Sequence, residues 1–566
     1  MRLSILVVVA FLLCSISSAQ EETVPVGHPV YTFLKRMDVK GYLARYRDAV
    51  LPLARGQVAR LLAEVSGADT SLSHAERGWL QDFEAEFRFD ASGSFAHVRS
   101  LFGPSEASFG SRFVGEFSGA EKFLYASNDS VTSLFVSGLL DLDARLIRGD
   151  ALGSEHSEFI QVGGRIRGTA LGHIGFLAQA TNAQFWGSRD LLARDPEISQ
   201  SYGLYTTDAQ NFDFSEGYIR YGSSFISVEL GQERLLWGTG QDQQMVLSQN
   251  PRTFPFLRLD IEYKAIKYTF IHGWLLGNSS TLLYQIPEDT SVFFSEPVYA
   301  DKFFAGHRFE LSFPGVLDVG FSEMYIYSNR SPDLAYLNPF VLLESAQRSR
   351  GERDNGFWAL DLRTRFIPGV QLYGTMLYDD IHFAELFQNF WYDRYAWQAG
   401  MIYADVATVS NTTLVVEYTH VEPWLFAHNR SRDGSYTSYE QLLGPRIGPN
   451  ADSWFFRLDY LPLRNLFVSL GVLIGRKGQN TYDSQGYLVE NVGADPLVPH
   501  RSTDPEMKSF LDGILDKSSR VEFTARFEIV NQIWIEGIYR YEAVHHTTAG
   551  GEEQNSTVIL HLKTEL

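Results

Sequence analysis

A regular alternation of apolar and polar side chains limits the possible folds of this chain more than any other feature. From Arg520 to Ile529, apolar side chains occupy every second position and polar or charged side chains lie between them. Segments 257–264 and 454–460 repeat this period of two. A β-strand directs successive side chains to opposite faces, so these segments predict strands with one apolar and one polar face. Both a soluble β-sandwich and a transmembrane barrel contain such strands, and alternation alone does not distinguish them.

The N-terminus and the cysteine content favour an exported protein. Residues 1–19 combine Arg2, an apolar run and small residues before Ala19, which is the pattern of a secretory signal peptide cleaved after Ala19. Cys14 is the only cysteine, so cleavage would leave an exported chain without disulfides. After residue 19 no window approaches the roughly 20 apolar residues that a spanning helix needs. A membrane location would therefore require strands.

Composition adds two constraints. The chain contains 28 Tyr and 41 Phe, and aromatic residues make up 14% of the total. The aromatic girdles of an outer-membrane barrel would explain this content. The formal net charge is −20, which argues against a nucleic-acid partner because nucleic acid attracts clusters of Lys and Arg.

The spacing of the turns favours the barrel over the sandwich. Short turns are predicted at Pro314-Gly315, Pro368-Gly369, Leu461-Pro462 and Val530-Asn531, and long loops at roughly 276–301, 328–355, 380–395, 422–452 and 475–517. Transmembrane barrels carry tight turns at one end and long loops at the other. We therefore predict an all-β transmembrane barrel of about 18 antiparallel strands over residues 133–566, with outer-membrane lipid and the barrel-assembly machinery as partners. The last strand ends at Leu566 instead of the usual aromatic residue.

The region before the barrel has a different periodicity. Residues 29–80 show helical spacing of apolar residues, and Ser73 with Glu76 forms a possible helix N-cap. We expect residues 20–132 to form a periplasmic helical region and the lead-in to the barrel. An ordinary soluble subdomain is the alternative.

Charged residues of both signs lie on the polar faces of the predicted strands. Those assigned to the barrel interior include Arg258, Asp260, Glu262, Arg363, Arg457, Asp459 and Arg526. A selective pore tends to carry a ring of one sign, whereas paired Arg and carboxylate groups can fill an interior. We therefore predict a plugged barrel, and the alternative is a wide, water-filled one.

The stretch GQERLLWGTG at 231–240 raises a separate question. Two glycines after an apolar run suggest a turn that binds phosphate, but no Gly-Lys-Ser/Thr end and no apolar-periodic helix follow. The polar residues 241–244 and the Asn250-Pro251 break disfavour a nucleotide site.

Several motifs, in their order along the chain, resemble the capsule assembly Wzi family. They are HPVYTFLKRMDVKG, LPLARGQVARLL, GQERLLWGTG, YLNPF at 336–340, YGTMLYDD at 373–380, VVEYTH at 415–420 and LLGPRIGPNAD at 442–452. The resemblance implies an 18-stranded outer-membrane barrel that is closed, carries a small periplasmic helical part, and attaches capsular polysaccharide to the cell as a surface lectin. It also places GQERLLWGTG at the outward end of a strand, where Gly238 and Gly240 bend the chain into an extracellular loop.

The long loops contain residue types that bind sugars. Candidate polysaccharide-binding residues are Trp237, Gln241, Tyr336, Asn338, Trp424 and Arg446. A flat ring can pack on a pyranose, and amide or guanidinium groups can bind hydroxyls or carboxylates. The Trp and Tyr residues could equally anchor the barrel at the membrane interface.

The sequence offers little for catalysis. Asp379, Asp380 and His382 form the best cluster of acid and base groups, but a solvated loop explains them, as it explains His545 and His546. The chain contains no nucleophile elbow, zincin motif or P-loop. We therefore expect a non-enzymatic protein without a cofactor that binds surface polysaccharide and helps to attach or assemble it. The alternative function is a porin or sugar channel.

Overall fold

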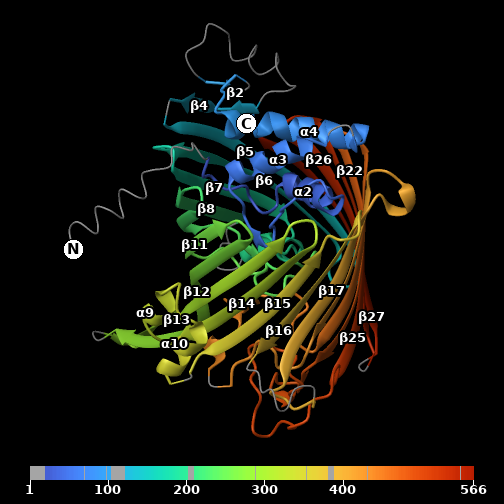
Figure 1. The fold of residues 1–566 in the computed structure, drawn as a ribbon. Coiled ribbons are helices and arrows are strands. Elements are labelled where there is room, and N and C mark those ends of the chain that lie inside the picture. Colours follow the sequence, from blue (N-terminus) through green and yellow to red (C-terminus); the bar gives the residue numbers. More distant parts are fainter. Residues whose placement is uncertain are drawn as a thin grey trace, which may run out of the picture.

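The computed structural model is one large antiparallel β-barrel with a group of helices at one end (Figure 1). It describes residues 20–68, 71–96, 98–102, 121–129, 131–201, 210–286, 289–351, 353–379, 388–429, 431–547 and 550–566, without the side chains of 279–298. The predicted signal peptide at 1–19 lies outside these residues, as do Asp380 and His382. Within the described part of the chain, no helix is long and apolar enough to span a membrane.

Eighteen strands of the described chain close the barrel. They are β5 (Ser133–Gly149), β6 (Gly153–Ala170), β7 (Ile174–Gly187), β8 (Asn211–Gly222), β9 (Ile226–Gln232), β11 (Phe256–Tyr263), β12 (Ile266–Ile286), β13 (Asp289–Phe313), β14 (Leu317–Ser328), β15 (Asn355–Thr364), β16 (Val370–Asp379), β17 (Arg394–Ala404), β18 (Thr412–Val421), β21 (Ala451–Leu463), β22 (Leu466–Gln479), β25 (Ile514–Val530), β26 (Ile533–His546) and β27 (Glu552–Glu565). Each pairs with its neighbours in antiparallel register, and β27 pairs with β5 to close the ring. The predicted fold class and strand number are confirmed.

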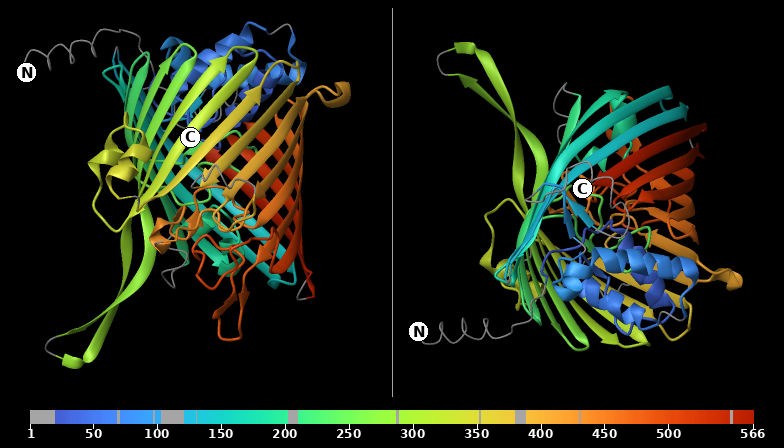
Figure 2. Two further views of the ribbon diagram at one scale, coloured as in Figure 1. Left: turned by 60° about the horizontal axis from the view of Figure 1, so that its bottom comes forward. Right: turned by 90° about the horizontal axis from the view of Figure 1, so that it is seen from above.

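The connections differ between the two ends of the barrel. Pro314-Gly315 and Pro368-Gly369 form short turns as predicted, whereas Leu461-Pro462 belongs to β21 and the turn follows at residues 464–465. The long loop predicted at 276–301 is wrong. β12 and β13 extend through this region as a long hairpin that projects from the barrel (Figure 2), because their backbones stay paired well beyond the neighbouring strands.

Four helices that precede the barrel in sequence lie at its end with the short turns. They are α2 (Pro29–Val39), α3 (Arg55–Ser66), α4 (His74–Glu86) and α5 (Arg88–Ser92), and they surround an apolar core of their own. The predicted N-cap is confirmed: the Ser73 hydroxyl accepts the Glu76 backbone N–H, and the Glu76 carboxylate accepts the Ser73 N–H. Viewed along the barrel, the helices cover only part of its mouth (Figure 2).

The two faces of the wall follow the alternation of the sequence. Large apolar side chains, among them Phe309, Leu360, Phe523, Phe527 and Leu560, are exposed on the outer face. Charged residues occupy the inner face of the same strands, such as Arg526 beside Phe527. This arrangement is that of a barrel whose outer surface contacts lipid.

Candidate functional site

The loop between β9 and β11 enters the barrel. Its residues Leu236–Trp237 form strand β10, which pairs with strand β1 (Val50–Leu51) of the helical region. The Gly238 N–H donates to the carbonyl of Ala49 at 2.9 Å, so the two segments meet inside the wall. The interpretation of GQERLLWGTG as a bend into an extracellular loop is therefore wrong. Gly238 turns the chain inward with a positive φ of 132°, a conformation that favours glycine.

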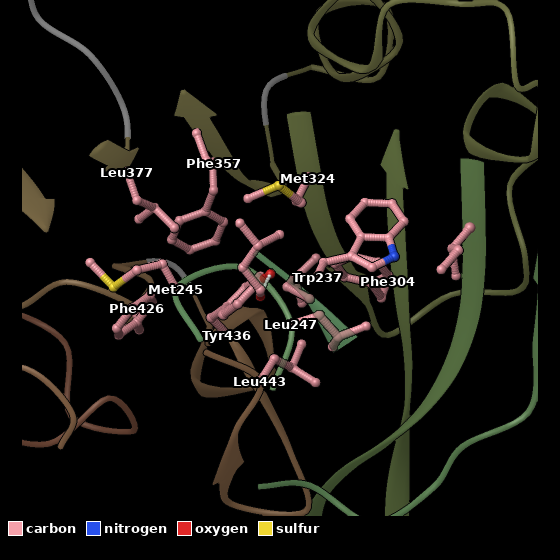
Figure 3. Close-up of a cluster of buried hydrophobic side chains, with 14 of the residues drawn as sticks. Trp237, Met245, Leu247, Phe304, Met324, Phe357, Leu377, Phe426, Tyr436 and Leu443 are labelled. Carbon is pink, nitrogen blue, oxygen red and sulfur yellow. Dashed lines mark hydrogen bonds between the residues drawn. The ribbon is translucent and has the colours of Figure 1, made fainter. Parts of the chain in front are cut away.

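Trp237 anchors this loop in a large apolar cluster. Its buried ring packs edge-on against Phe304 of β13, at 6.3 Å between ring centroids, and the cluster continues through Phe357 of β15 (Figure 3). A second inward loop, residues 422–450, adds Phe426 and Tyr436, and the Tyr436 hydroxyl donates to the Val246 carbonyl at 2.6 Å. The inner wall at the loop end is thus apolar where loops pack against it.

The glycine-rich turn does bind an anion, but the anion belongs to the chain. The Glu417 carboxylate of β18 accepts the backbone N–H groups of Gln241, Asp242 and Gln243 at 2.6, 3.2 and 3.0 Å. The Tyr373 hydroxyl donates to the same carboxylate at 2.8 Å. Successive N–H groups that converge on one anion form a backbone nest. Here the nest fixes the tip of the inward loop to the wall.

Ion pairs tie the helical region to the inner wall. Arg363 of β15 contacts both Asp48 of the helical region and Asp318 of β14, and it also donates to the Tyr46 carbonyl at 2.6 Å. Burial opposes ionisation of Asp48, but the nearby Lys35 and Arg363 cations outweigh it and lower the pKa of Asp48 to about 2. The carboxylate therefore stays charged and paired at neutral pH.

Each predicted interior charge pairs with a charge of opposite sign. Arg258 and Asp260 pair at 2.8 Å, Glu262 binds Arg47 at 2.7 Å, Arg457 and Asp459 pair at 3.1 Å, and Arg526 binds Glu536 at 2.6 Å. Three of the predicted residues, Arg258, Glu262 and Arg363, contact the helical region directly. The interior is therefore held by pairs of opposite sign instead of a ring of one sign.

The predicted polysaccharide-binding residues lie in three separate places. Gln241 lies half-buried at the nest, and Arg446 is exposed on the second inward loop, where its Nε donates to Asn250 at 3.0 Å. Tyr336 and Asn338 lie outside the barrel, on a segment that packs against the outer face of β13 and β14. The six residues therefore do not form one site.

The prediction that three aromatic rings contact a polymer needs correction. Trp237 and Tyr336 are 0% exposed and Trp424 is 3% exposed. Trp237 fills the interior cluster, Tyr336 stacks on Tyr327 of the outer wall at 4.8 Å, and Trp424 packs beneath other loops. Rings buried in this way have no free face for a sugar.

A different group of aromatic side chains lies at the loop end. Trp391 stacks on His500 with 4.1 Å between ring centroids and an interplanar angle of 8°, and Phe390 stacks on Tyr392 at 5.2 Å. All four are half-buried, and Trp424 supports them by an edge contact with His500. We call Phe390, Trp391, Tyr392 and His500 the loop-face cluster. The run QNFWYDRY at 388–395 was the sequence signal for it.

Loop contacts hold this cluster in place. The Trp391 N–H donates to the Glu506 carbonyl at 2.9 Å, and the Lys508 N–H donates to the Asn389 carbonyl at 2.8 Å. Arg501 and Asp504 pair at 2.7 Å on the same loop as His500. Aromatic rings beside fixed polar groups can pack on sugar rings and bind hydroxyls.

The described chain is therefore a closed transmembrane-type barrel with a partly filled interior and an aromatic cluster on its loops. A family model described as capsule assembly protein Wzi matches residues 99–558, and the chain belongs to this family. The predicted family resemblance is confirmed.

Solved structures agree with the fold. The Escherichia coli outer membrane protein Wzi, a carbohydrate-binding β-barrel involved in group 1 capsule assembly, is similar over 95% of this chain and 99% of its own, with a TM-score of 0.55 and 10% identity. A BenF-like porin from Pseudomonas fluorescens covers 76% of this chain and 99% of its own, at a TM-score of 0.42 and 10% identity. OccK3 from Pseudomonas aeruginosa covers 76% of this chain and 95% of its own, at a TM-score of 0.38 and 11% identity. The last two scores are too low to support a functional argument, and no curated protein matches the sequence.

Proposed function

We propose that this protein is an outer-membrane barrel that binds surface polysaccharide at its loop end and helps to hold it on the cell. The observation that carries the proposal is the loop-face cluster, in which Trp391 and Tyr392 are partly accessible beside the paired Arg501 and Asp504. Membership in a capsule assembly family and the fold shared with a carbohydrate-binding barrel support it.

The proposed arrangement also assigns the two ends of the barrel. Residues 1–19 direct export and are removed, the barrel-assembly machinery inserts strands β5 to β27 into the outer membrane, and the helical region before β5 faces the periplasm with the short turns. Gln241, Asn338 and Arg446 remain candidates for secondary contacts with the polymer. We propose no covalent chemistry, because the sequence lacks the motifs that would support it.

Deletion of the gene tests this function. Polysaccharide synthesis should continue, but the polymer should appear in the medium instead of on the cell. A Trp391→Ala, Tyr392→Ala double variant should release polymer too, because loss of weak contacts at each of many copies reduces avidity strongly. Trp454→Ala, on the outer wall, is the matched control and should retain the polymer. Surface polymer at the normal level in the deletion strain would contradict the proposed function.

One observation favours the alternative of a porin or sugar channel. The inner faces of β22, β25 and β26 are partly accessible, and ion pairs on them, such as Arg520 with Glu542, are 36% and 21% exposed. Conductance of the purified protein in planar bilayers separates the two functions. Large, stable openings would favour the channel, and little steady current would favour the polysaccharide-binding barrel.

A further inference from the structure

The loop between β14 and β15 folds back over the outside of the barrel. We call residues 329–351 the outer-wall segment; it contains α9 (Leu334–Leu337) and α10 (Leu343–Ser349), and both helices lie outside the strands (Figures 1 and 2). Phe304 of β13 points inward to Trp237, so its neighbour Phe303 points outward. Phe303 packs with Tyr336 and Leu343 of the segment. The contact surface is therefore the outer wall.

The wall beneath the segment is unusually polar. His307 of β13 and Glu323 of β14 face each other across the strand pair, and the His307 Nε2 lies 2.6 Å from the Glu323 carboxylate. The same carboxylate accepts the backbone N–H groups of Leu343 and Glu344 at 3.1 and 2.7 Å. Both wall side chains are buried. The segment therefore covers an acid–imidazole pair and, near it, a second buried imidazole, His272, whose Nε2 lies 2.6 Å from the Tyr327 hydroxyl.

The uncovered wall next to this pair is apolar. Glu323 is paired with Trp358 on β15, and Phe321, two residues along β14, is paired with the exposed Leu360. A bare carboxylate on a lipid-facing wall would be costly, since a charge there destabilises a barrel. By burying Glu323, the segment replaces a polar patch with its own outer surface.

That outer surface exposes several large apolar side chains. Leu334, Phe340 and Leu342 are 79%, 75% and 60% exposed, the first two being the most exposed apolar side chains of the described chain. The Phe340 ring stacks at 6.3 Å on Tyr268 of β12, which is paired with the exposed Phe309 of β13. The apolar surface of the segment is thus continuous with the apolar surface of the barrel wall.

Cationic side chains follow the apolar ones. Arg348 and Arg350 lie at the C-terminal end of α10 and are exposed, and Arg353 comes shortly after. Arg348 pairs with Glu344 and Arg350 with Asp333, both at 2.8 Å, but the two guanidinium side chains remain 68% and 48% exposed. An apolar face with neighbouring Arg residues is the pattern of a segment that lies in a membrane interface and meets anionic headgroups.

We propose that the outer-wall segment is embedded in the lipid of the membrane. Leu334, Phe340 and Leu342 contact acyl chains, and Arg348 and Arg350 reach the phosphate groups of the lipid headgroups. The segment completes the lipid-facing surface where the wall carries His307 and Glu323. This inference rests on the proposed outer-membrane location. It gives Phe340 of the YLNPF motif a role in the membrane.

Depth measurement with a single spin label tests the inference. Cys14 lies within residues 1–19, so the mature chain would offer no other cysteine, and Phe340→Cys gives one labelling site. Leu360→Cys on the bare outer wall is the lipid reference, and Tyr487→Cys on the exposed loop between β22 and β25 is the water reference. Each variant is reconstituted in vesicles of phosphatidylethanolamine and phosphatidylglycerol, and its folding is checked by heat-dependent gel mobility.

The readout is the accessibility of the label to oxygen relative to a water-soluble nickel chelate. We expect this ratio at position 340 to match that at 360 and to exceed that at 487 several-fold. A ratio at 340 equal to that at 487, with 360 still in lipid, overturns the inference and leaves the barrel location intact. A water-like ratio at 360 overturns both. Leu342→Cys repeats the test if the first variant does not fold.

Discussion

Two sectors of the barrel interior differ in how they are packed. In the filled sector, along β11 to β18, inward loops and the helical region cover the inner wall, so that the side chain of Arg363 is 2% exposed and that of its partner Asp318 is 7% exposed. In the open sector, along β22, β25 and β26, the side chains of Arg526 and Glu536 are 36% and 13% exposed. Both sectors carry the same kind of ion pair on the same kind of strand.

The difference shows that the packing around an ion pair decides how much the pair contributes to the stability of the fold. A buried pair that loses one partner leaves an uncompensated charge, which is strongly destabilising. A partly exposed pair is screened by water and contributes little. The filled sector therefore fixes the loops and helices to the wall, and the open sector leaves a wall whose ion pairs are partly exposed.

The largest effect is expected from Arg363→Ala in the filled sector. Asp318 and Asp48 would lose their shared guanidinium group while they remain buried, and each would keep a single cation, Arg365 for Asp318 and Lys35 for Asp48, at a cost of about 3 kcal/mol in the free energy of unfolding. Chemical denaturation of the protein in detergent micelles measures the change. A loss below about 1 kcal/mol would show that the filled sector is hydrated in solution, as the open sector is.

The next effect is expected from Glu417→Gln at the nest. The amide keeps the size of the side chain but replaces one of its two acceptor oxygens with an N–H₂ group, which then faces at least one of the three backbone donors, so the loop tip should loosen at a cost of about 1–3 kcal/mol. Faster hydrogen exchange at residues 241–243, with unchanged exchange in the helical region, would indicate this local release. Equal exchange in both proteins would contradict the role of Glu417.

The attachment of the helical region should weaken in acid. The pKa of Asp48 falls from an ordinary 3.8 to about 2 in the folded protein, because Lys35 and Arg363 outweigh the effect of burial. Its stabilisation, about 2 kcal/mol, is therefore complete above pH 4 and is lost as the pH falls toward 2. Limited proteolysis of the helical region by pepsin, compared across this range, measures the effect. Asp48→Asn should show a smaller pH dependence.

The smallest effect is expected from Arg526→Ala in the open sector. Glu536 would remain in contact with water, so the free energy of unfolding should change by about 0–1 kcal/mol. The same denaturation assay provides the comparison with Arg363→Ala. If the two variants lose equal stability, the distinction between the sectors does not hold.

The sequence by itself determined the barrel. Alternation such as that from Arg520 to Ile529 specifies which side chains face lipid and which face the interior, and the Pro-Gly turns specify one end. The capping box at Ser73 and Glu76 was predictable for the same reason, since all its determinants lie within four residues. Local patterns suffice wherever the partners are neighbours in the chain or on the next strand.

Only the tertiary structure decided where the loops go. Trp237 and Tyr336 both lie in long loops rich in sugar-compatible residues, yet one fills the interior and the other packs on the outer wall. Trp391 lies in a loop of similar composition and stays partly accessible at the loop end. An apolar ring is buried by whichever apolar surface reaches it, and those surfaces come from strands distant in sequence, such as Phe304 beside Trp237. No local sequence pattern specifies this contact. The burial of the loop aromatics can therefore be recognised only from the closed barrel.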